Sequence, residues 1–404
     1  MAEVQPLTEQ SVIDYIRGRA VYNTVFDRAN DLRATQITEG NVNLLFRVYS
    51  ESDPKGKSVI VKQALPYAWR YPDFKMPVDR SRIEYEVLKI EGKYCPDQVP
   101  ILYDYDEDRH ILIIEDLNDH LVMREGLMQQ KRYPHVDRHM GLFMARTLFY
   151  TSDLYLSSGE KKAMVPKFIN PVLCKVQEDL VFTQPYIEHP NNRYTPQLEP
   201  VVREIYADDD LRSEIFIFKE RYMTHAQALI HNDLHTGSIM LNEEETKVVD
   251  PEFAFFGPMA HDIGTYFANL ALSYAAQEYH AKDPQTRAEY RQWLADLIVR
   301  TWNIFEEEFL RLWEEEGNED WPSPTFRRKY MAQRLQETAG FGAAEMMRRL
   351  IGLAHVHDFW TIEDEEVRAT AERLGLNIAR AWIKNYRKIG HIEDLVEMVV
   401  NAQA

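Results

Sequence analysis

Three carboxylate side chains lie in two short polar segments whose arrangement suits phosphoryl transfer. Asp233 follows an apolar segment, 228–230, and Asp250 and Glu252 follow a second apolar segment, 247–249. Phosphoryl transfer asks a protein mainly to orient the attacking hydroxyl and to hold the metal ion that bridges the ATP phosphates. We therefore expect Asp233 to orient a hydroxyl group, and Asp250 and Glu252 to offer hard oxygen ligands to Mg²⁺.

Binding of a polyanion such as ATP to an acidic protein requires local positive charge, and Lys62 is a candidate source. It ends an apolar strand sequence, Val-Ile-Val-Lys, which would anchor its stem and leave the ammonium group for phosphate. A turn at 39–41 precedes this strand, and Gly40 lacks the Cβ that would keep phosphate away from the backbone. Glu84 and Glu86 follow on a predicted helix, and either could pair with Lys62.

Several separated motifs give the chain a wider resemblance. It resembles the protein-kinase-like small-molecule kinases, and among them the methylthioribose kinase family. The motifs occur in the family's order along nearly the whole chain, and they are Glu39–Leu44, Ile60–Tyr67, His231–Ser238, Asp250–Pro258 and Arg348–His355. The resemblance implies an α+β, two-lobed fold and the use of ATP and Mg²⁺. The implied reaction is phosphorylation of the 1-hydroxyl of 5-methylthioribose in methionine salvage.

The resemblance also implies roles for individual residues. The residues implied to bind the nucleotide are Gly40, Asn41, Asn43, Lys62 and Glu115. The residues implied to bind the substrate are Asn232, Asp233, Arg348 and Arg349, with Asp233 as the catalytic residue and Asp250 and Glu252 as metal ligands. In such a fold the segment around Glu115 would connect the lobes and contact adenine through its backbone.

Two positions depart from the family's pattern. The family usually has glycine where this chain has Asn232, and it usually has a Gly-Glu-Ser-Trp-Pro sequence where this chain has 68–77. Asparagine tolerates a left-handed backbone better than most residues, so we expect the loop to keep its form. Ser238 stands where many kinases have a metal-binding asparagine, which directs attention to Glu252. For His231 we favour organisation of the loop over proton transfer.

Arg348 and Arg349 lie on a predicted apolar-periodic helix, 345–352. Adjacent residues cannot share one face of a helix, so at least one arginine should turn to solvent, to an acidic partner or to the active cleft. Sequence alone favours solvated side chains, whereas the resemblance implies binding of the sugar or of the transferring phosphoryl group.

Composition narrows the class of protein. The 404 residues carry a formal charge of -18, which disfavours nonspecific binding to nucleic acid or to an anionic membrane. Cys95 and Cys174 lack partners at zinc-ligand spacing, and no apolar run approaches the length of about 18 residues that a membrane-spanning helix needs. We expect a cytoplasmic protein whose partners are small molecules, and the resemblance favours a homodimer.

The apolar pattern predicts a small sheet followed by a helical region. We expect a first helix over 8–18 capped by Thr8, strands over 43–49, 58–63 and 111–114, a turn at 53–56, and a helix over 81–90. The boundary between lobes should fall near residue 118, giving an N-lobe of 1–117 and a C-lobe of 118–404. Within the second part, Asp283-Pro284 predicts the start of a long helix that ends at Gly317.

Two alternatives to this function remain open. One is a kinase of another small alcohol, such as 5-deoxyribose or an aminoglycoside. The other is a nucleotide-binding pseudokinase whose altered catalytic loop no longer transfers phosphate.

Overall fold

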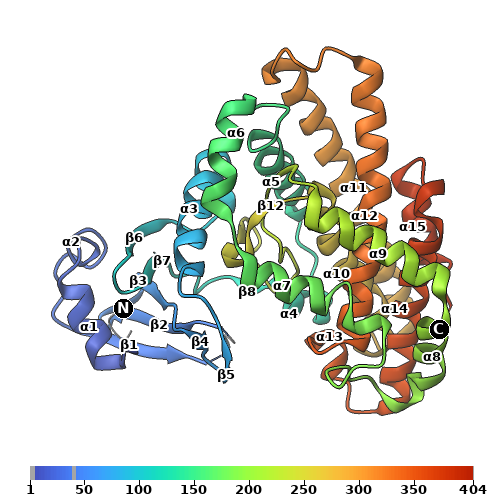
Figure 1. Cartoon of the computed structure of the whole chain (residues 1–404). Coiled ribbons are helices and arrows are strands. Elements are labelled where there is room, and N and C mark those ends of the chain that lie inside the picture. Colours follow the sequence, from blue (N-terminus) through green and yellow to red (C-terminus); the bar gives the residue numbers. More distant parts are fainter. Residues whose placement is uncertain (1–4, 39–41, 404) are drawn as a thin grey trace. The chain divides into compact units, whose positions relative to one another are not determined.

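The computed structural model describes residues 5–38 and 42–403. Backbone contacts divide them into two compact units (Figure 1). The first unit comprises the described residues up to His120 together with Lys247–Ala254, and the second comprises Leu121–Thr246 with the described residues from Phe255 onward. Segment Lys247–Ala254, which carries Asp250 and Glu252, therefore belongs with the N-terminal part of the chain.

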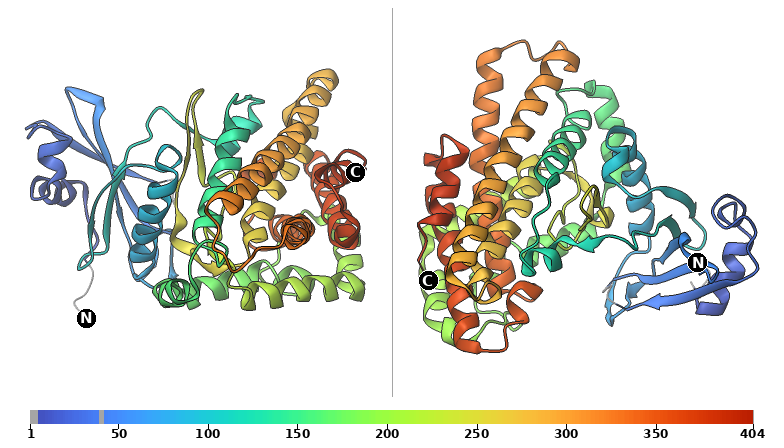
Figure 2. Two further views of the ribbon diagram at one scale, coloured as in Figure 1. Left: turned by 90° about the horizontal axis from the view of Figure 1, so that it is seen from above. Right: turned by 180° about the vertical axis from the view of Figure 1, so that it is seen from behind.

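The first unit is built on a five-stranded antiparallel sheet of order β1-β2-β3-β7-β6. Its strands are β1 (Leu32–Ile37), β2 (Leu44–Ser50), β3 (Asp53–Gln63), β6 (Leu102–Asp106) and β7 (Ile111–Glu115), with a separate pair, β4 (Tyr67–Ala68) and β5 (Tyr71–Lys75). Its helices are α1 (Glu9–Arg17), α2 (Val21–Thr24), α3 (Arg80–Tyr94), η1 (Pro96–Gln98) and η5 (Pro251–Phe253). Figure 2 shows α1 and α2 on one side of the sheet and α3 on the other.

Most of the elements predicted in this unit are confirmed. Helix α1 is capped by Thr8, whose hydroxyl accepts a hydrogen bond from the Ser11 N–H group. The predicted turn at 53–56 is wrong, because β3 already begins at Asp53 and the chain reverses at residues 51–52. Of these four exposed residues only Asp53 pairs with β2, opposite Ser50, because the register shifts between Tyr49 and Ser50.

The second unit is mainly helical. Its helices are α4 (Met123–Met128), α5 (Val136–Tyr150), α6 (Ser158–Met164), η2 (Val165–Phe168), α7 (Pro171–Leu180), η3 (Gln184–Tyr186), η4 (Pro196–Leu198), α8 (Glu199–Ala207), α9 (Asp209–Thr224), α10 (Met259–His280), α11 (Pro284–Glu316), α12 (Pro324–Ile351), α13 (His357–Trp360), α14 (Glu365–Asn385), η6 (Tyr386–Lys388) and α15 (Ile392–Val400). Its short strands are β8 (Leu121–Val122), β9 (Ala228–Ile230), β10 (Ile239–Leu241) and β12 (Phe255–Gly257), and β11 (Thr246–Val248) overlaps the boundary of the units. The α+β fold class is confirmed.

Helix α11 begins and ends where the sequence predicts. Asp283 accepts a hydrogen bond from the Thr286 N–H group, Pro284 is the first helical residue, and Gly317 follows the last. Apolar residues recur at three- and four-residue steps along this helix and are buried, and they are Leu294, Leu297, Ile298, Trp302, Phe305, Phe309 and Leu312. This apolar stripe therefore packs into the core.

Helices α10 and α12 touch through their backbones. A Cβ at Gly264 would lie 2.6 Å from the Thr338 carbonyl oxygen and 2.8 Å from the Gly342 nitrogen. Gly342 in turn faces the Gly264 carbonyl oxygen. Since backbone atoms cannot swing aside as a flexible side chain can, this crossing has no room for a larger residue.

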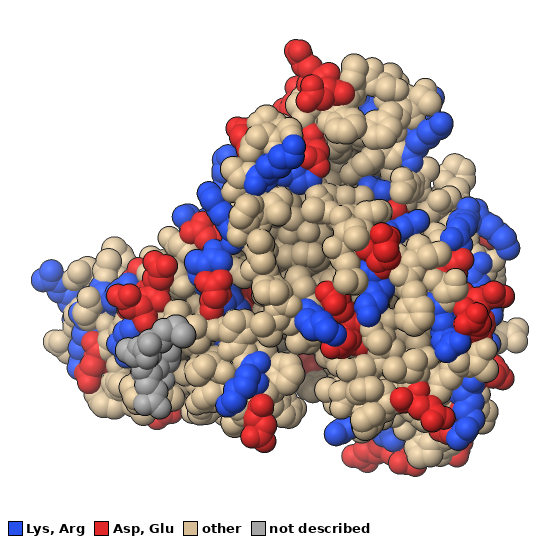
Figure 3. Space-filling view, viewed as in Figure 1, with Lys and Arg blue, Asp and Glu red and all other residues tan. Residues whose placement is uncertain are grey.

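Among the described residues, no helix is long and apolar enough to cross a membrane. Lys and Arg side chains are interspersed with Asp and Glu over the face seen in Figure 3, so the acidic excess is spread on this face and is not gathered into one field.

We predict that Gly264→Ala lowers the free energy of unfolding by about 1–3 kcal/mol, because an added methyl group overpacks the crossing. Denaturant unfolding of the purified variant measures this loss. Gly159→Ala on α6 is the matched control, since a Cβ there meets nothing within 4 Å. Equal stability of the two variants would contradict the proposed tightness of the crossing.

Candidate active site

Lys62 lies buried at the end of β3 and contacts two carboxylates of the first unit. Its Nζ is 2.8 Å from Glu84 Oε1 and 2.6 Å from Asp250 Oδ1. Burial disfavours the charged lysine, but the attraction of Asp250, Glu84 and Glu252 outweighs it and raises the pKa of Lys62. Of the two candidate partners on α3, Glu84 is the one that pairs with Lys62, and Glu86 lies near Lys89 instead.

Glu252 forms a second buried cluster beside this pair. Its Oε2 accepts a hydrogen bond from Asn43 Nδ2 at 3.0 Å and lies 3.2 Å from Arg80 Nε. Arg80 is fully buried at the start of α3 and also donates to Asn43 Oδ1 at 3.2 Å. Asn43 and Glu252, which the resemblance assigns to the nucleotide and to the metal, are thus joined by a cation that the sequence did not single out.

Asp250 differs from Glu252 in its exposure. Its side chain is 52% exposed, whereas that of Glu252 is 6% exposed. Asp250 also adopts a left-handed backbone, φ 64°, immediately before η5. Such a conformation costs a non-glycine residue of order 1–3 kcal/mol and often marks a functional position. The turn thereby presents Asp250 outward and Glu252 inward.

The remaining residues predicted to bind the nucleotide have different settings. Gly40 and Asn41 lie outside the described residues. Glu115 ends β7, where its N–H group donates to the Ile101 carbonyl oxygen at 2.9 Å and its Oε2 accepts from the Ile101 N–H group at 3.0 Å. Its side chain is therefore turned toward the neighbouring chain segment, and a contact with adenine would use the backbone.

Asp233 lies in the second unit against the two arginines of α12. Its Oδ1 is 3.8 Å from Arg348 Nη1 and 3.6 Å from Arg349 Nη2. Burial alone would raise the pKa of this carboxyl, but a hydrogen bond from His235 and the attraction of Arg348 and Arg349 hold the pKa well below the usual range of aspartate. Asp233 is therefore ionised at neutral pH, as a hydroxyl-orienting group must be.

The arginine pair is held by an acid on its own helix. Glu345 Oε1 accepts from Arg349 Nε at 2.6 Å, and its Oε2 accepts from Arg348 Nη1 at 3.2 Å. All three side chains are buried, so the expectation of solvated arginines is wrong. Both arginines leave the apolar stripe for an acidic partner, because helical spacing of three and four residues brings both of them to Glu345.

Backbone hydrogen bonds from the loop to α10 fix the residues before Asp233. The N–H groups of His231 and Asn232 donate to Asp262 Oδ2 and Oδ1 at 2.7 and 2.8 Å. Burial raises the pKa of Asp262 to about 7, although these two donors lower it. His231 Nδ1 accepts from the Asp233 N–H group at 3.3 Å, which is the loop-organising arrangement expected of this histidine.

Asn232 takes the left-handed conformation expected at this position, with φ 68°. Its side chain is completely buried, and its Oδ1 accepts from the Tyr222 hydroxyl at 3.2 Å. Its carbonyl oxygen accepts from Gln177 Nε2 at 2.9 Å, and Gln177 Oε1 accepts from Arg348 Nη1 at the same distance. The extra bulk of asparagine is thus directed into the protein, and its backbone is tied to the arginine pair.

Sequence reasoning missed several polar residues of these clusters. Glu345 could have been found from its spacing of three and four residues before the arginines. His235 could have been found from its place two residues after Asp233. Arg80, Asp262 and Gln177 reach the site from other elements, and their sequence neighbourhoods carry no signal of it.

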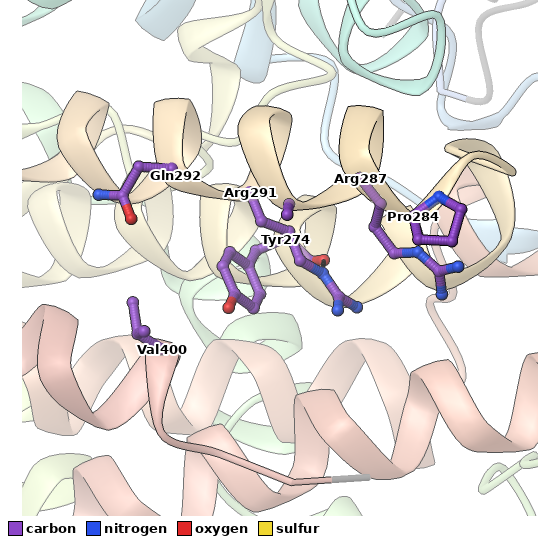
Figure 4. A pocket seen from close by; sticks show the side chains of 7 residues that line it. Tyr274, Pro284, Arg287, Arg291, Gln292 and Val400 are labelled. Carbon is purple, nitrogen blue, oxygen red and sulfur yellow. Dashed lines mark hydrogen bonds between the residues drawn. The ribbon is translucent and has the colours of Figure 1, made fainter.

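A separate pocket of about 390 Å³ lies where the start of α11 meets α10 and the end of α15 (Figure 4). Two of its lining residues, Arg287 and Arg291, both pair with Glu278, and Arg291 Nε donates to the Tyr274 carbonyl oxygen at 2.9 Å. None of the predicted site residues lines it. This pocket therefore has no part in the clusters described above.

Comparisons with known proteins identify the family to which the chain belongs. A family model described as "Phosphotransferase enzyme family" matches residues 170–313. The chain is 38% identical over 392 residues to the methylthioribose kinase of Bacillus cereus (strain B4264), covering 96% of this chain and 95% of that protein. It is 39% identical over 381 residues to the methylthioribose kinase of Geobacillus sp. (strain WCH70), covering 94% and 92%. A Plasmodium vivax ethanolamine kinase structure is 16% identical, with a TM-score of 0.47, over 95% of this chain and 93% of that chain. On the strength of the full-length relatives, the chain belongs to the methylthioribose kinase family.

Proposed function

We propose that the protein transfers the γ-phosphoryl group of ATP to the 1-hydroxyl of 5-methylthioribose, as a step of methionine salvage. The observation that carries the substrate is the similarity to two methylthioribose kinases along nearly the whole of both chains. The setting of Asp233 supports the reaction, because a partly buried aspartate kept ionised beside two arginines can accept a hydrogen bond from a sugar hydroxyl.

The first unit supplies the proposed nucleotide site. Lys62 binds phosphate oxygens, and Glu84 keeps its ammonium group in place when Asp250 turns to another partner. The resemblance also assigns Gly40 and Asn41 to nucleotide binding. The backbone at Glu115 contacts adenine.

The second unit supplies the proposed acceptor site. Asp233 orients the 1-hydroxyl, and Arg348 and Arg349 bind the sugar or stabilise the charge of the transferring group. Asn232 contributes through its backbone, since its side chain is engaged with Tyr222. Because phosphoryl transfer needs little covalent chemistry from the protein, these positioning contacts can account for most of the catalysis.

Asp250, which precedes η5, and Glu252 within η5 offer carboxylate oxygens of the kind that bind a magnesium ion. Mg²⁺ prefers hard oxygens and usually takes one or two carboxylates, with water and substrate phosphates completing its shell. Among the described residues no group of three or more His, Cys, Asp and Glu side chains could hold a metal by itself, which agrees with such a shared shell. Asp250 would be the principal ligand and Glu252 the second. The bound ion would neutralise phosphate charge.

The proposal includes a homodimer, which the family resemblance favours, and a cytoplasmic location, which the composition of the sequence favours. Light scattering on the purified protein distinguishes one chain from two. Localisation is tested by fractionating cells that express the tagged chain.

Asp233→Asn should lower turnover by about 10²- to 10⁴-fold, the usual loss when a positioned base is removed. ATP binding should change little, because Lys62 and its partners belong to the other unit. Steady-state kinetics and nucleotide titration measure the two effects separately. Turnover near that of the parent would contradict the role of Asp233.

Glu252→Gln should raise the Mg²⁺ concentration needed for half-maximal activity, because one hard anionic oxygen is lost. Since Glu252 also neutralises Arg80, the unfolding temperature without metal must be compared with that of the parent. A folded variant whose Mg²⁺ dependence is unchanged would show that Glu252 serves Arg80 alone. Asp250→Asn provides the comparison for loss of the exposed ligand.

Methylthioribose should be phosphorylated in preference to ribose when both compete at equal concentration. An apolar pocket that accepts the methylthio group would bury the ribose 5-hydroxyl without a partner, a penalty of about 1–3 kcal/mol. Mass spectrometry of the two products measures the ratio. Equal or better use of ribose would overturn the proposed substrate and leave the kinase reaction intact. The same assay includes 5-deoxyribose and an aminoglycoside. If neither methylthioribose nor ribose is phosphorylated, the alternatives are favoured, namely a kinase of another small alcohol or a pseudokinase.

A further inference from the structure

We propose that His235 is a positioning residue that fixes the reactive oxygen of Asp233. The inference rests on the proposed role of Asp233 as the hydroxyl-orienting group. His235 Nε2 lies 3.4 Å from Asp233 Oδ2, somewhat beyond the usual range of about 2.7–3.2 Å for an N–H···O hydrogen bond, and it is the ring nitrogen that faces this oxygen.

The hydrogen bonds of the ring determine its tautomer. His235 Nδ1 accepts a hydrogen bond from the Gly237 N–H group at 2.9 Å, so Nδ1 carries a lone pair and no proton. In a neutral imidazole the proton must then be on Nε2. The nitrogen that faces Asp233 is therefore a donor.

The surroundings of the ring keep it neutral. Burial lowers the pKa of His235, the attraction of Asp233 opposes this, and the nearby charges of Arg349 and Arg124 lower it further. Arg124 is anchored next to the turn, because its Nε lies 3.0 Å from Asp358 Oδ2 and its N–H group donates to the Thr236 carbonyl oxygen at 3.1 Å.

Glycine at position 237 allows this close approach. A Cβ there would lie 2.7 Å from His235 Cε1 and 2.9 Å from Arg124 Nη1. The imidazole and the guanidinium group thus both pack against the turn where a side chain would otherwise stand. The ring is confined as well as hydrogen-bonded.

The two oxygens of Asp233 have different surroundings. Oδ1 is buried against Arg348 and Arg349, and within the described part of the chain it has no hydrogen-bond partner at close range. The side chain as a whole is 19% exposed, which leaves Oδ2 as the oxygen that a hydroxyl can reach. A carboxylate oxygen has two lone pairs, so Oδ2 can accept from His235 and from the sugar at once.

Two substitutions separate this role from a local structural one. In His235→Asn the side-chain oxygen can take the position of Nδ1 and accept from the Gly237 N–H group. The shorter side chain has no donor that reaches Asp233 as Nε2 does. His235→Gln extends an amide to the place of Nε2 and can donate to Asp233. We expect His235→Asn to lower kcat by about 10- to 100-fold, by analogy with residues that orient metal ligands through hydrogen bonds, with KM for both substrates within about twofold of the parent. His235→Gln should recover most of kcat.

A matched control exists in the same unit. His189 Nδ1 also accepts a hydrogen bond from the N–H group two residues later, that of Asn191, at 3.2 Å. His189→Asn therefore repeats the chemical change at a similar turn, and its kcat should match that of the parent. Thermal unfolding of every variant accompanies the kinetics.

The outcomes decide between the proposals. Parental kcat in His235→Asn, or lower kcat in His235→Gln than in His235→Asn, would show that the ring serves only the Gly237 turn and would overturn the inference. If Asp233→Asn is inactive at the same time, the proposed function stands without it. If Asp233→Asn retains full turnover, the role of Asp233 fails and the inference about His235 fails with it, whereas the proposed function fails only if the parent does not phosphorylate methylthioribose.

Discussion

The burial of two adjacent arginines against one glutamate is the constraint on which the proposed acceptor site depends. Two cations on neighbouring residues of α12 repel each other, and removal from water makes each of them costly. Glu345 offsets this by accepting from both, and Arg349 and Arg348 in turn outweigh burial and hold the pKa of Glu345 below its ordinary value. One carboxylate between two guanidinium groups leaves an excess of positive charge. Asp233 faces that excess, which keeps it ionised in a buried setting.

The first unit also buries charged side chains together, but there the excess charge is negative. Glu84, Asp250 and Glu252 outnumber Lys62 and Arg80, and burial raises the pKa of Glu84 although Lys62 opposes this. This cluster has negative charge to spare, as a site that recruits a metal cation should. In the proposed function, a divalent cation bound beside Asp250 would offset this excess of negative charge.

Much of this could be predicted from local sequence, and the failures share a cause. The cap of α1, the limits of α11 and the acids after β9 and β11 depend on residues within a few positions of one another, so patterns of spacing reveal them. The turn expected at 53–56 is misplaced because the chain already reverses at 51–52, where Asp53 pairs with Ser50. The choice of Glu84 over Glu86, the contact of Arg80 with Glu252 and the anchoring of the loop by Asp262 depend on elements distant in sequence. No periodicity in a single chain encodes which of two neighbouring acids will face a lysine on another element.

The glycine crossing of α10 and α12 has a consequence for how acceptor preference can change. Asp262, which holds the loop of Asp233, lies two residues before Gly264 on α10, and Glu345, which holds the arginines, lies three residues after Gly342 on α12. With backbone against backbone, the separation of loop and arginines is already at its minimum, and exchanging apolar residues of different size cannot adjust it in small steps. The distance between the Asp233 loop and the two arginines is therefore fixed, and an acceptor hydroxyl must fit that distance in order to bind. Divergence toward other acceptors would therefore proceed through the surrounding loops, while the two helices stay as they are.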